Sequence, residues 1–175
     1  MAQSRAAAEQ LLCEAMAARQ GSAVCTRPRY ILGAGDRHTL PGLSKLARAG
    51  WVLGSGAQRF SVIDVDDYAQ ILFRVAEREL ASDAPYRGGL HVGYREGLSL
   101  DELLGGLAAA AERPAPTRRL RVPGFVVSGL AAFPSRKTRR GATIYQLFGQ
   151  DHHVGVERLA GWLGEELVSR DPRQV

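Results

Sequence analysis

The sequence has few features that would place it in a membrane or hold it together covalently. Among its 175 residues there are 2 cysteines, and Cys13 and Cys25 stand apart in a helical and a strand-like segment. Isolated thiols of this kind are typical of a reducing environment and form neither a disulfide nor a zinc-binding pattern. The longest apolar run, residues 122–133, is far shorter than the ~20 residues that cross a bilayer. The residues after Met1 also lack the pattern of a secretory signal. We therefore expect a cytoplasmic protein with no membrane span.

Lysine is nearly absent, so arginine supplies almost all of a net charge of +5 and a pI of about 9.7. The two basic stretches "TRRLRVP" and "SRKTRRG" are separated by an apolar segment. A nucleic-acid-binding domain normally combines a basic stripe with a recognisable module or with aromatic side chains for stacking. Because no such module surrounds these stretches, the sequence favours no nucleic-acid partner.

No metal site is expected from the histidines or the acidic residues. The four histidines lack a glutamate at the spacing of a zinc protease, and the adjacent His152 and His153 point in different directions on any regular element. Asp64, Asp66 and Asp67 precede an apolar helical pattern, where carboxylates typically cap the helix. We interpret them as caps rather than as cation ligands.

The hydrophobic pattern predicts a mixed α/β fold in a single domain over residues 1–175. Helices are expected at 2–19, 40–49, from 64 onward, after the capping box of Ser99 and Glu102, and near 156–167. Strands are expected at 22–26, on both sides of Gly54-Ser55-Gly56, and in "GGLHVGY". In the first helix the apolar side is expected to carry Ala8, Leu11, Leu12 and Ala15. The apolar stretch 122–133 is read as a packing helix, with a lid over a pocket as the alternative.

Three stretches of the sequence resemble the extended short-chain dehydrogenase/reductase superfamily. They are "SRAAAEQLL", "TRPRYILGAGDRHTLPGL" and "FSVIDVDDYAQILFRVAE", in the order and at the spacing of that superfamily. The branch that they resemble is the 3β-hydroxysteroid dehydrogenase/isomerase and NAD-dependent epimerase/dehydratase group. The resemblance implies the C-terminal part of a doubly wound, Rossmann-like sheet with a small substrate-binding lobe. It covers residues 4–112 well and the last sixty residues loosely.

The same resemblance implies where the cofactor and the substrate would lie. Arg27 and Pro28, with the backbone of Arg29, Tyr30 and Ile31, would border the nicotinamide end of NAD or NADP. The positions that would face the substrate are His38, Leu40, Lys45 and Arg59. Asp67 would cap its own helix.

Departures from the family pattern weigh against catalysis by this chain alone. Met1 stands where the family has its catalytic tyrosine, and Arg5 stands where it has the partner lysine. A thioether transfers no proton, and a broad guanidinium fork is not equivalent to an ammonium. Neither "GAGD" nor "GSGAQ" has the glycine spacing of a dinucleotide-binding turn, so the N-terminal cofactor-binding half is expected to be missing.

Two functions therefore stay open from the sequence. The first is part of an NAD(P)-dependent oxidoreductase or epimerase that acts on a sterol-like or sugar-nucleotide alcohol and is inactive as this chain. The second is a non-catalytic binding or regulatory module that completes its sheet with a partner, with a second copy or with the missing half. The sequence does not decide whether the chain is an enzyme.

Overall fold

The structure is a computed structural model that describes residues 2–132 and 134–174. The chain divides into two compact units, which are described separately. Unit 1 comprises the described residues of Met1–Gly33, Ser61–Glu96 and Val154–Val175. Unit 2 comprises Ala34–Phe60 together with the described residues of Gly97–His153. That the whole chain functions as one domain stays a prediction.

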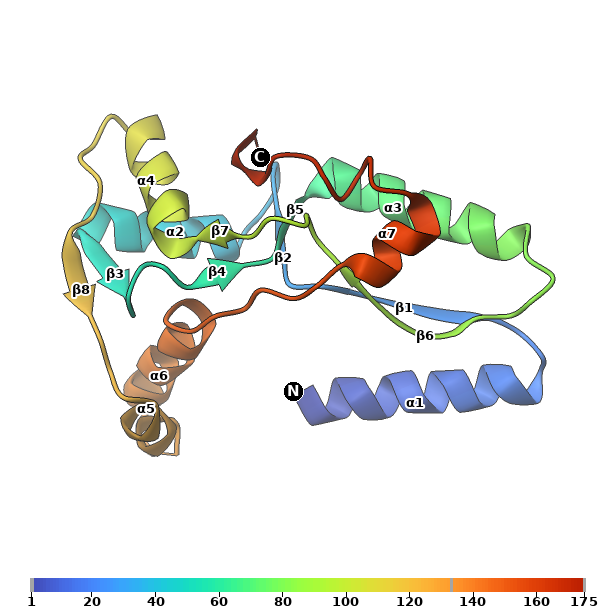
Figure 1. The fold of residues 1–175 in the computed structure, drawn as a ribbon. Coiled ribbons are helices and arrows are strands. Elements are labelled where there is room, and N and C mark those ends of the chain that lie inside the picture. The colour runs from blue at the N-terminus through green and yellow to red at the C-terminus, as the bar shows by residue number, and fades with distance from the viewer. Residues whose placement is uncertain (1, 133, 175) are drawn as a thin grey trace. The chain divides into compact units, whose positions relative to one another are not determined.

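Unit 1 contains two parallel strand pairs with helices beside them (Figure 1). Its strands are β1 (Ala23–Pro28), β2 (Tyr30–Leu32), β5 (Val62–Asp64) and β6 (Arg87–Val92). Its helices are α1 (Ala2–Ala18), α3 (Val65–Leu80), α7 (Glu157–Leu163) and the short 3-10 helix η1 (Pro172–Gln174). Strand β1 pairs with β6, and β2 pairs with β5. The core of the unit forms where β2 and β5 meet α3, with buried Leu32, Ile63 and Ile71.

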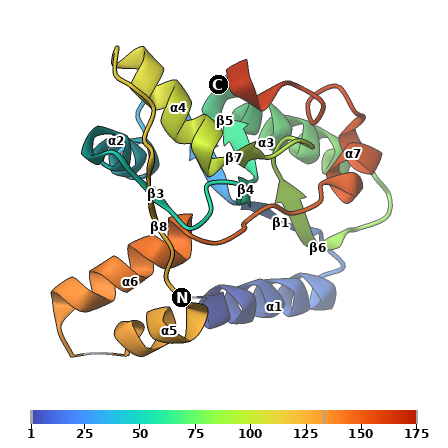
Figure 2. The same cartoon turned by 60° about the vertical axis from the view of Figure 1, so that its left-hand side comes forward.

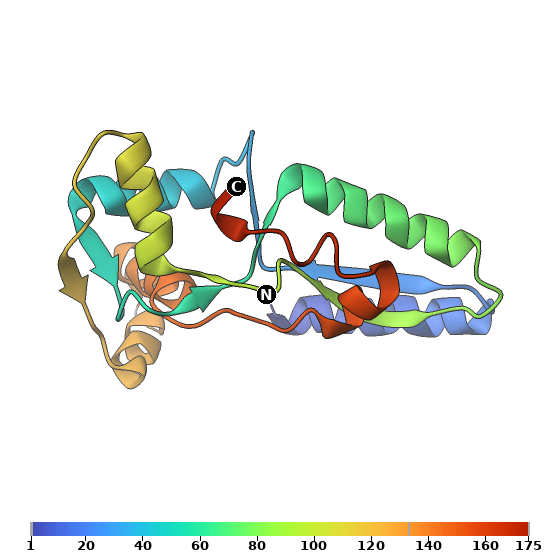
Figure 3. The same cartoon turned by 45° about the horizontal axis from the view of Figure 1, so that its top comes forward.

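Helix α1 exposes the side that its apolar residues occupy, contrary to the expectation from its sequence. The helix lies alongside β1 and β6 (Figure 3), but Leu11 is 65% exposed and Leu12 47%. The less exposed side carries Glu9, Cys13 and Met16 instead. On that side Glu9 forms an ion pair with Arg27 of β1, and this pair holds the side against the sheet.

At the start of α3 the expected capping role is confirmed for Asp64, whereas the expectation that Asp67 caps the helix is wrong. The Asp64 carboxylate accepts a hydrogen bond of 2.8 Å from the Asp66 N–H. Asp67 is buried, and its carboxylate binds the Tyr94 hydroxyl at 2.6 Å and the Arg170 guanidinium. Its side chain points into the unit, where it joins three distant segments of the chain.

Unit 2 is built from two small strand pairs and two helical layers (Figure 2). Its strands are β3 (Trp51–Leu53), β4 (Arg59–Phe60), β7 (Leu98–Ser99) and β8 (Arg118–Leu120). Its helices are α2 (Thr39–Ala49), α4 (Leu100–Ala110), α5 (Gly124–Ala131) and α6 (Arg136–Phe148). Strand β3 runs parallel to β8, and β4 runs antiparallel to β7. Helices α2 and α4 pack together, as do α5 and α6.

Local signals predicted the helices α2 and α4 of unit 2, whereas α6 was not expected from the sequence. The capping box of Ser99 and Glu102 is present, with the Glu102 N–H donating to the Ser99 hydroxyl and the Glu102 carboxylate accepting from the Ser99 N–H. Helix α2 ends at Gly50, whose φ of 74° favours glycine. The segment 122–133 contains α5, which packs on α6 yet leaves most of its apolar side chains exposed. None of the described helices is long and apolar enough to cross a membrane.

Candidate functional site

The positions expected beside the nicotinamide follow one another along two strands of unit 1. Pro28 ends β1 opposite Val92, and Tyr30 and Ile31 enter β2 opposite Val62 and Ile63. Strand β2 is therefore a short strand that was not among those expected from the sequence, and it runs parallel to β5, which leads into α3. Pairing in this way fixes the backbone of the Arg27–Ile31 turn at the carboxyl end of β1.

Arg27 is already engaged by a carboxylate of α1. Its Nε donates to both Glu9 carboxylate oxygens at 3.0 and 2.9 Å, and a terminal nitrogen also binds Glu9. The hydrogen bond from Arg27 lowers the pKa of Glu9, and the same bond raises the pKa of Arg27. Arg27 lies opposite His91 in the β1–β6 register and remains partly exposed. Its role in this unit is to join α1 to the sheet.

Proton transfer requires a phenol with a lowered pKa, and two tyrosines of this chain have raised pKa values instead. Burial raises the pKa of Tyr30 to about 12, although the nearby Arg29 works in the opposite direction. Burial also raises the pKa of Tyr94, whose hydroxyl is bound to Asp67. Both phenols keep their protons at neutral pH.

The position equivalent to the family's tyrosine, Met1, lies outside the described residues. Arg5, at the lysine position, is an exposed residue of α1. The guanidinium at this position carries a positive charge, but it is broader than the compact ammonium of a lysine.

In unit 2 the expected substrate positions lie in two places, three of them at or along α2 and one on the strand β4. His38 precedes α2, Leu40 is half-buried in its first turn, and Lys45 is exposed further along the helix. The Asp36 carboxylate accepts hydrogen bonds from the backbone N–H groups of His38, Thr39 and Leu40 at 2.8–2.9 Å. Burial acts to raise the pKa of Asp36, but these three N–H groups outweigh it and lower the pKa. The N-terminus of α2 is thus occupied by an anion from its own chain.

Arg59 is anchored at both its backbone and its side chain. Its N–H donates to the Asp151 carboxylate at 3.1 Å, and its carbonyl accepts from the His152 N–H at 2.8 Å. Its Nε and one terminal nitrogen donate to the Gly97 carbonyl at 3.3 and 3.0 Å. The other terminal nitrogen has no partner among the described residues. The guanidinium is therefore held in place with donors left for a ligand.

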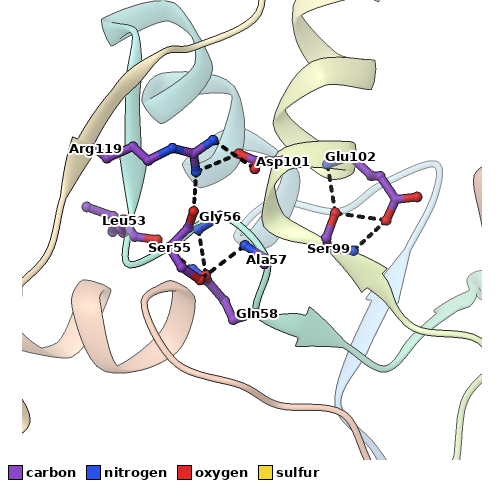
Figure 4. Close-up of polar contacts among 9 residues, drawn as sticks. All are labelled: Leu53, Ser55, Gly56, Ala57, Gln58, Ser99, Asp101, Glu102 and Arg119. Atoms are coloured by element: carbon purple, nitrogen blue, oxygen red, sulfur yellow. Dashed lines mark hydrogen bonds and ion pairs between the residues drawn. The ribbon is translucent and has the colours of Figure 1, made fainter.

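The loop that precedes Arg59 is rigid because a buried glutamine satisfies its polar groups (Figure 4). The Gln58 side-chain oxygen accepts from the Gly56 N–H at 2.8 Å and from the Ser55 hydroxyl at 3.0 Å. Its nitrogen donates to the Leu53 carbonyl at 2.5 Å and the Phe148 carbonyl at 2.7 Å. Sequence reasoning missed Gln58, because a glutamine in a glycine-rich loop gives no sign of burial.

A second clamp on this loop comes from Asp101 and Arg119. The Asp101 carboxylate accepts from the two terminal nitrogens of Arg119 at 3.1 and 2.9 Å, and Arg119 also donates to the Ser55 carbonyl (Figure 4). The Asp101 N–H donates to the Gly56 carbonyl at 2.9 Å. Positive φ values of 75° and 88° make Gly54 and Gly56 the glycines that this tight turn requires. Asp101 and Arg119 are 18 residues apart, a spacing that no local motif marks.

Neither of the two glycine-rich segments, "GAGD" and "GSGAQ", fits a dinucleotide pyrophosphate. Such a cradle needs free backbone N–H groups at the start of a helix that follows a strand. At α2 these groups are held by Asp36, and the Gly54–Gly56 loop leads into strand β4 with its Gly56 N–H bound to Gln58. A pyrophosphate at either place would have to displace an internal partner. In the described part of the chain, no cluster of three or more histidine, cysteine or acidic side chains could hold a metal.

Comparison with known proteins confirms the resemblance drawn from the three motifs. Residues 2–86 match the NAD dependent epimerase/dehydratase family. No curated protein matches the chain.

Several solved structures share the fold. A UDP-N-acetylglucosamine 4-epimerase from Methanobrevibacter ruminantium M1, in complex with UDP-N-acetylmuramic acid, superposes with a TM-score of 0.55 and 12% identity, over 93% of this chain and 50% of that one. RMD from Pseudomonas aeruginosa, complexed with NADPH, superposes with a TM-score of 0.52 and 17% identity, over 96% of this chain and 55% of that one. A UDP-glucuronic acid 4-epimerase from Bacillus cereus, in complex with NAD, superposes with a TM-score of 0.50 and 14% identity, over 86% of this chain and 40% of that one. The Rossmann-like α/β fold is confirmed, and the chain spans about half the length of these structures.

Proposed function

We propose that this chain, whose residues 2–86 match the NAD dependent epimerase/dehydratase family, supplies the nicotinamide edge and the substrate lobe of an NAD(P)-dependent oxidoreductase or epimerase. The observation that carries the proposal is that match, which includes the whole turn from Arg27 to Ile31 and the segment from His38 to Arg59. The intact reaction would move a hydride between an alcohol carbon of the substrate and the nicotinamide. Sugar-nucleotide alcohols are the substrate class that we favour over sterols.

Two features of unit 2 support a sugar nucleotide. Arg59 keeps unpaired donors on a guanidinium that Gly97 holds in place, and such a fork suits a phosphate group. Lys45 adds an exposed positive charge on α2. The similar structures named above include a complex with a UDP-linked sugar and others with NAD or NADPH, and this agrees with the proposed substrate and cofactor.

Hydride transfer by this chain alone is not expected, for chemical reasons. The pyrophosphate of a dinucleotide has no suitable cradle in the described residues, because the candidate N–H groups are bound internally. The position of the proton-transferring phenol is held by Met1, and Tyr30 keeps its proton. We therefore propose that the cofactor-binding half comes from additional polypeptide.

Titration of the purified chain with NADH and NADPH, followed by fluorescence, tests the inactivity. We expect no micromolar binding and no oxidation of UDP-glucose or UDP-galactose. Micromolar binding followed by alcohol oxidation would overturn this part of the proposal.

Calorimetric titration with UDP tests the substrate lobe independently of the cofactor. Charge-assisted hydrogen bonds to an arginine predict that Arg59→Gln weakens UDP binding about tenfold. The matched control Arg48→Gln, an exposed arginine of α2, should leave the affinity unchanged. Equal affinities for wild type and Arg59→Gln, or binding of a sterol in preference to UDP, would contradict the sugar-nucleotide assignment.

A non-catalytic binding module is the second candidate, and the sheet of unit 1 favours it. Strand β1 has β6 as its one strand neighbour among the described residues, and α1 exposes Leu11 and Leu12 beside it. Open strand edges and apolar surfaces commonly pair with another chain. Sedimentation should then show a dimer or larger species, whereas a monomer that unfolds cooperatively would count against this function.

A further inference from the structure

One segment of the chain, residues 113–150, carries positive charge alone. None of the 18 acidic residues of the protein lies between Glu112 and Asp151. The cations of the segment are Arg113, Arg118, Arg119, Arg121, Arg136, Lys137, Arg139 and Arg140. All of them are exposed. The α5–α6 hairpin of unit 2 consists of the described residues of 124–148 (Figure 2). Four of the cations lie in this hairpin, and the other four precede it in the sequence.

The same hairpin exposes large apolar side chains. Phe125 of α5 is 79% exposed, and Val126 and Leu130 are exposed on the same helix. Val127 is the buried residue by which α5 packs. A largely exposed phenylalanine within a mostly apolar helix is unusual on a surface that faces only water.

Helix α6 divides its exposed side between charge and apolar surface. Ala142, Tyr145 and Phe148 are buried. Lys137, Arg140, Ile144 and Leu147 are exposed and follow one another at helical spacing, so they form one stripe with cations at its start and apolar residues at its end. Helices that lie in the interfacial layer of a membrane expose lysine and arginine together with large apolar residues, and the hairpin exposes both kinds.

The cations of the hairpin are not used within the protein. Among the described residues, Arg136, Lys137, Arg139 and Arg140 have no side-chain hydrogen bond or ion pair. By contrast, Arg27, Arg95 and Arg170 of unit 1 each bind a carboxylate. The charge of the hairpin is therefore available to an external anion.

We propose that the α5–α6 hairpin docks on the surface of an anionic phospholipid membrane. The cations of α6 bind lipid headgroups, and Phe125, Val126 and Leu130 enter the boundary between headgroups and acyl chains. Charge complementarity selects this partner, because the exposed cations of a segment that contains no acidic residue are attracted to anionic lipid within a Debye length. The mode is peripheral, in agreement with the finding that no described helix can span a bilayer.

Nucleic acid is the competing polyanion, and the apolar composition of the hairpin argues against it. Single-stranded nucleic acid is held by aromatic side chains on which bases stack. Here the exposed apolar groups are mainly aliphatic, as in Val126, Leu130 and Ile144, and Tyr145 is buried with its hydroxyl accepting from the Val122 N–H at 2.8 Å. Transfer of aliphatic groups from water into a lipid interface is favourable, whereas a phosphate backbone offers them no apolar partner.

Co-sedimentation of the full chain with vesicles tests the proposal. The vesicles contain phosphatidylglycerol and phosphatidylcholine in equal parts, with pure phosphatidylcholine as the comparison. Each cation near an anionic surface contributes about fivefold to binding, so Lys137→Gln/Arg140→Gln should weaken binding about 25-fold. Phe125→Ser should weaken it about tenfold through lost apolar burial. The control Arg19→Gln/Arg48→Gln removes the same charge from exposed positions elsewhere and should bind nearly as the wild type does.

A second measurement keeps the test decisive if Phe125→Ser fails to fold. Phe125→Trp retains the apolar side chain, and its fluorescence should be quenched by brominated acyl chains in the anionic vesicles. Equal binding to both vesicle types, absence of quenching, or equal loss in the control would overturn the proposal. Binding to an oligonucleotide that Phe125→Ser leaves unchanged would assign the surface to nucleic acid and would also overturn it.

Discussion

Helices α1 and α3 both flank parallel strands of unit 1, but they are attached to it in opposite ways. Helix α3 buries Ile71 and Val75, and Asp67 near its start binds Tyr94 and Arg170. Helix α1 exposes Leu11 and Leu12 and is joined to β1 through a partly exposed pair, Glu9 and Arg27. The stability of unit 1 therefore depends on α3 much more than on α1.

The difference has a functional meaning. Helix α1 is the segment that resembles the family's active-site helix, and β1 leads into the proposed cofactor edge. Regions with few buried apolar contacts open at lower free energy than the core. The part of this chain closest to the proposed chemistry is thus the part that would gain most from additional polypeptide packed against it.

The largest expected effect comes from removing a core side chain of α3. Ile71 is 0% exposed, so Ile71→Ala should lower the free energy of unfolding by about 3 kcal/mol through lost burial and a cavity. Leu11→Ala on α1 should change it by less than about 0.5 kcal/mol. Urea unfolding followed by circular dichroism measures both. Comparable losses for the two variants would mean that α1 is also part of the core.

Asp67→Asn should have the next largest effect. The amide keeps the shape but removes the charge that binds Arg170 and the strong acceptor for Tyr94, at a buried position. We expect a loss of about 2 kcal/mol in unfolding free energy. Asp66→Asn is the matched control, because Asp66 is an exposed residue of the same helical turn. If both substitutions lower the unfolding free energy equally, the hydrogen bonds and the ion pair of Asp67 add no stability beyond the interaction of a carboxylate with the helix dipole.

Tyr94→Phe separates the hydroxyl from the ring and adds a pH signature. The hydroxyl donates to Asp67 and accepts from the Asp64 N–H at 3.2 Å, so its removal should cost about 1 kcal/mol at pH 7. Burial raises the pKa of Tyr94 above its ordinary value of 10.0, so its stabilising contribution is complete below pH 10 and is lost as the pH rises through the higher folded value. Unfolding measured from pH 8 upward should show a smaller alkaline loss in the variant. If the variant lost as much unfolding free energy at alkaline pH as the wild type does, the loss would come from groups other than Tyr94.

Sequence reasoning succeeded where the signal is local. The capping box of Ser99 and Glu102 lies within three residues, and it is present. By contrast, Asp67 binds partners 27 and 103 residues away, and no pattern near it in the sequence reveals them.

Two errors have a common physical origin. Hydrophobic periodicity identifies which side of a helix is apolar, but not whether another element covers it, so the exposed side of α1 was misjudged. Strand β8 was missed for a similar reason, since its three residues are all exposed and it exists through pairing with β3, which lies far away in the sequence. Among candidate site residues, Asp36 and Gln58 were missed. Their side chains act by hydrogen bonding to backbone groups, and only the folded chain brings those groups within reach.

The smallest expected effect tests the attachment of α1 itself. Glu9→Gln should lower the unfolding free energy by about 0.5 kcal/mol at pH 7, as is typical of a partly exposed ion pair. The hydrogen bond from Arg27 lowers the pKa of Glu9 below 4.5, so this contribution is present above pH 4.5 and is lost as the pH falls through the lower folded value. Wild type and variant should therefore converge in urea midpoint on acidification, while the exposed control Glu14→Gln should differ little from wild type at either pH. A loss as large as that of Asp67→Asn would remove the contrast between the two helices, because α1 would then be held as firmly as α3.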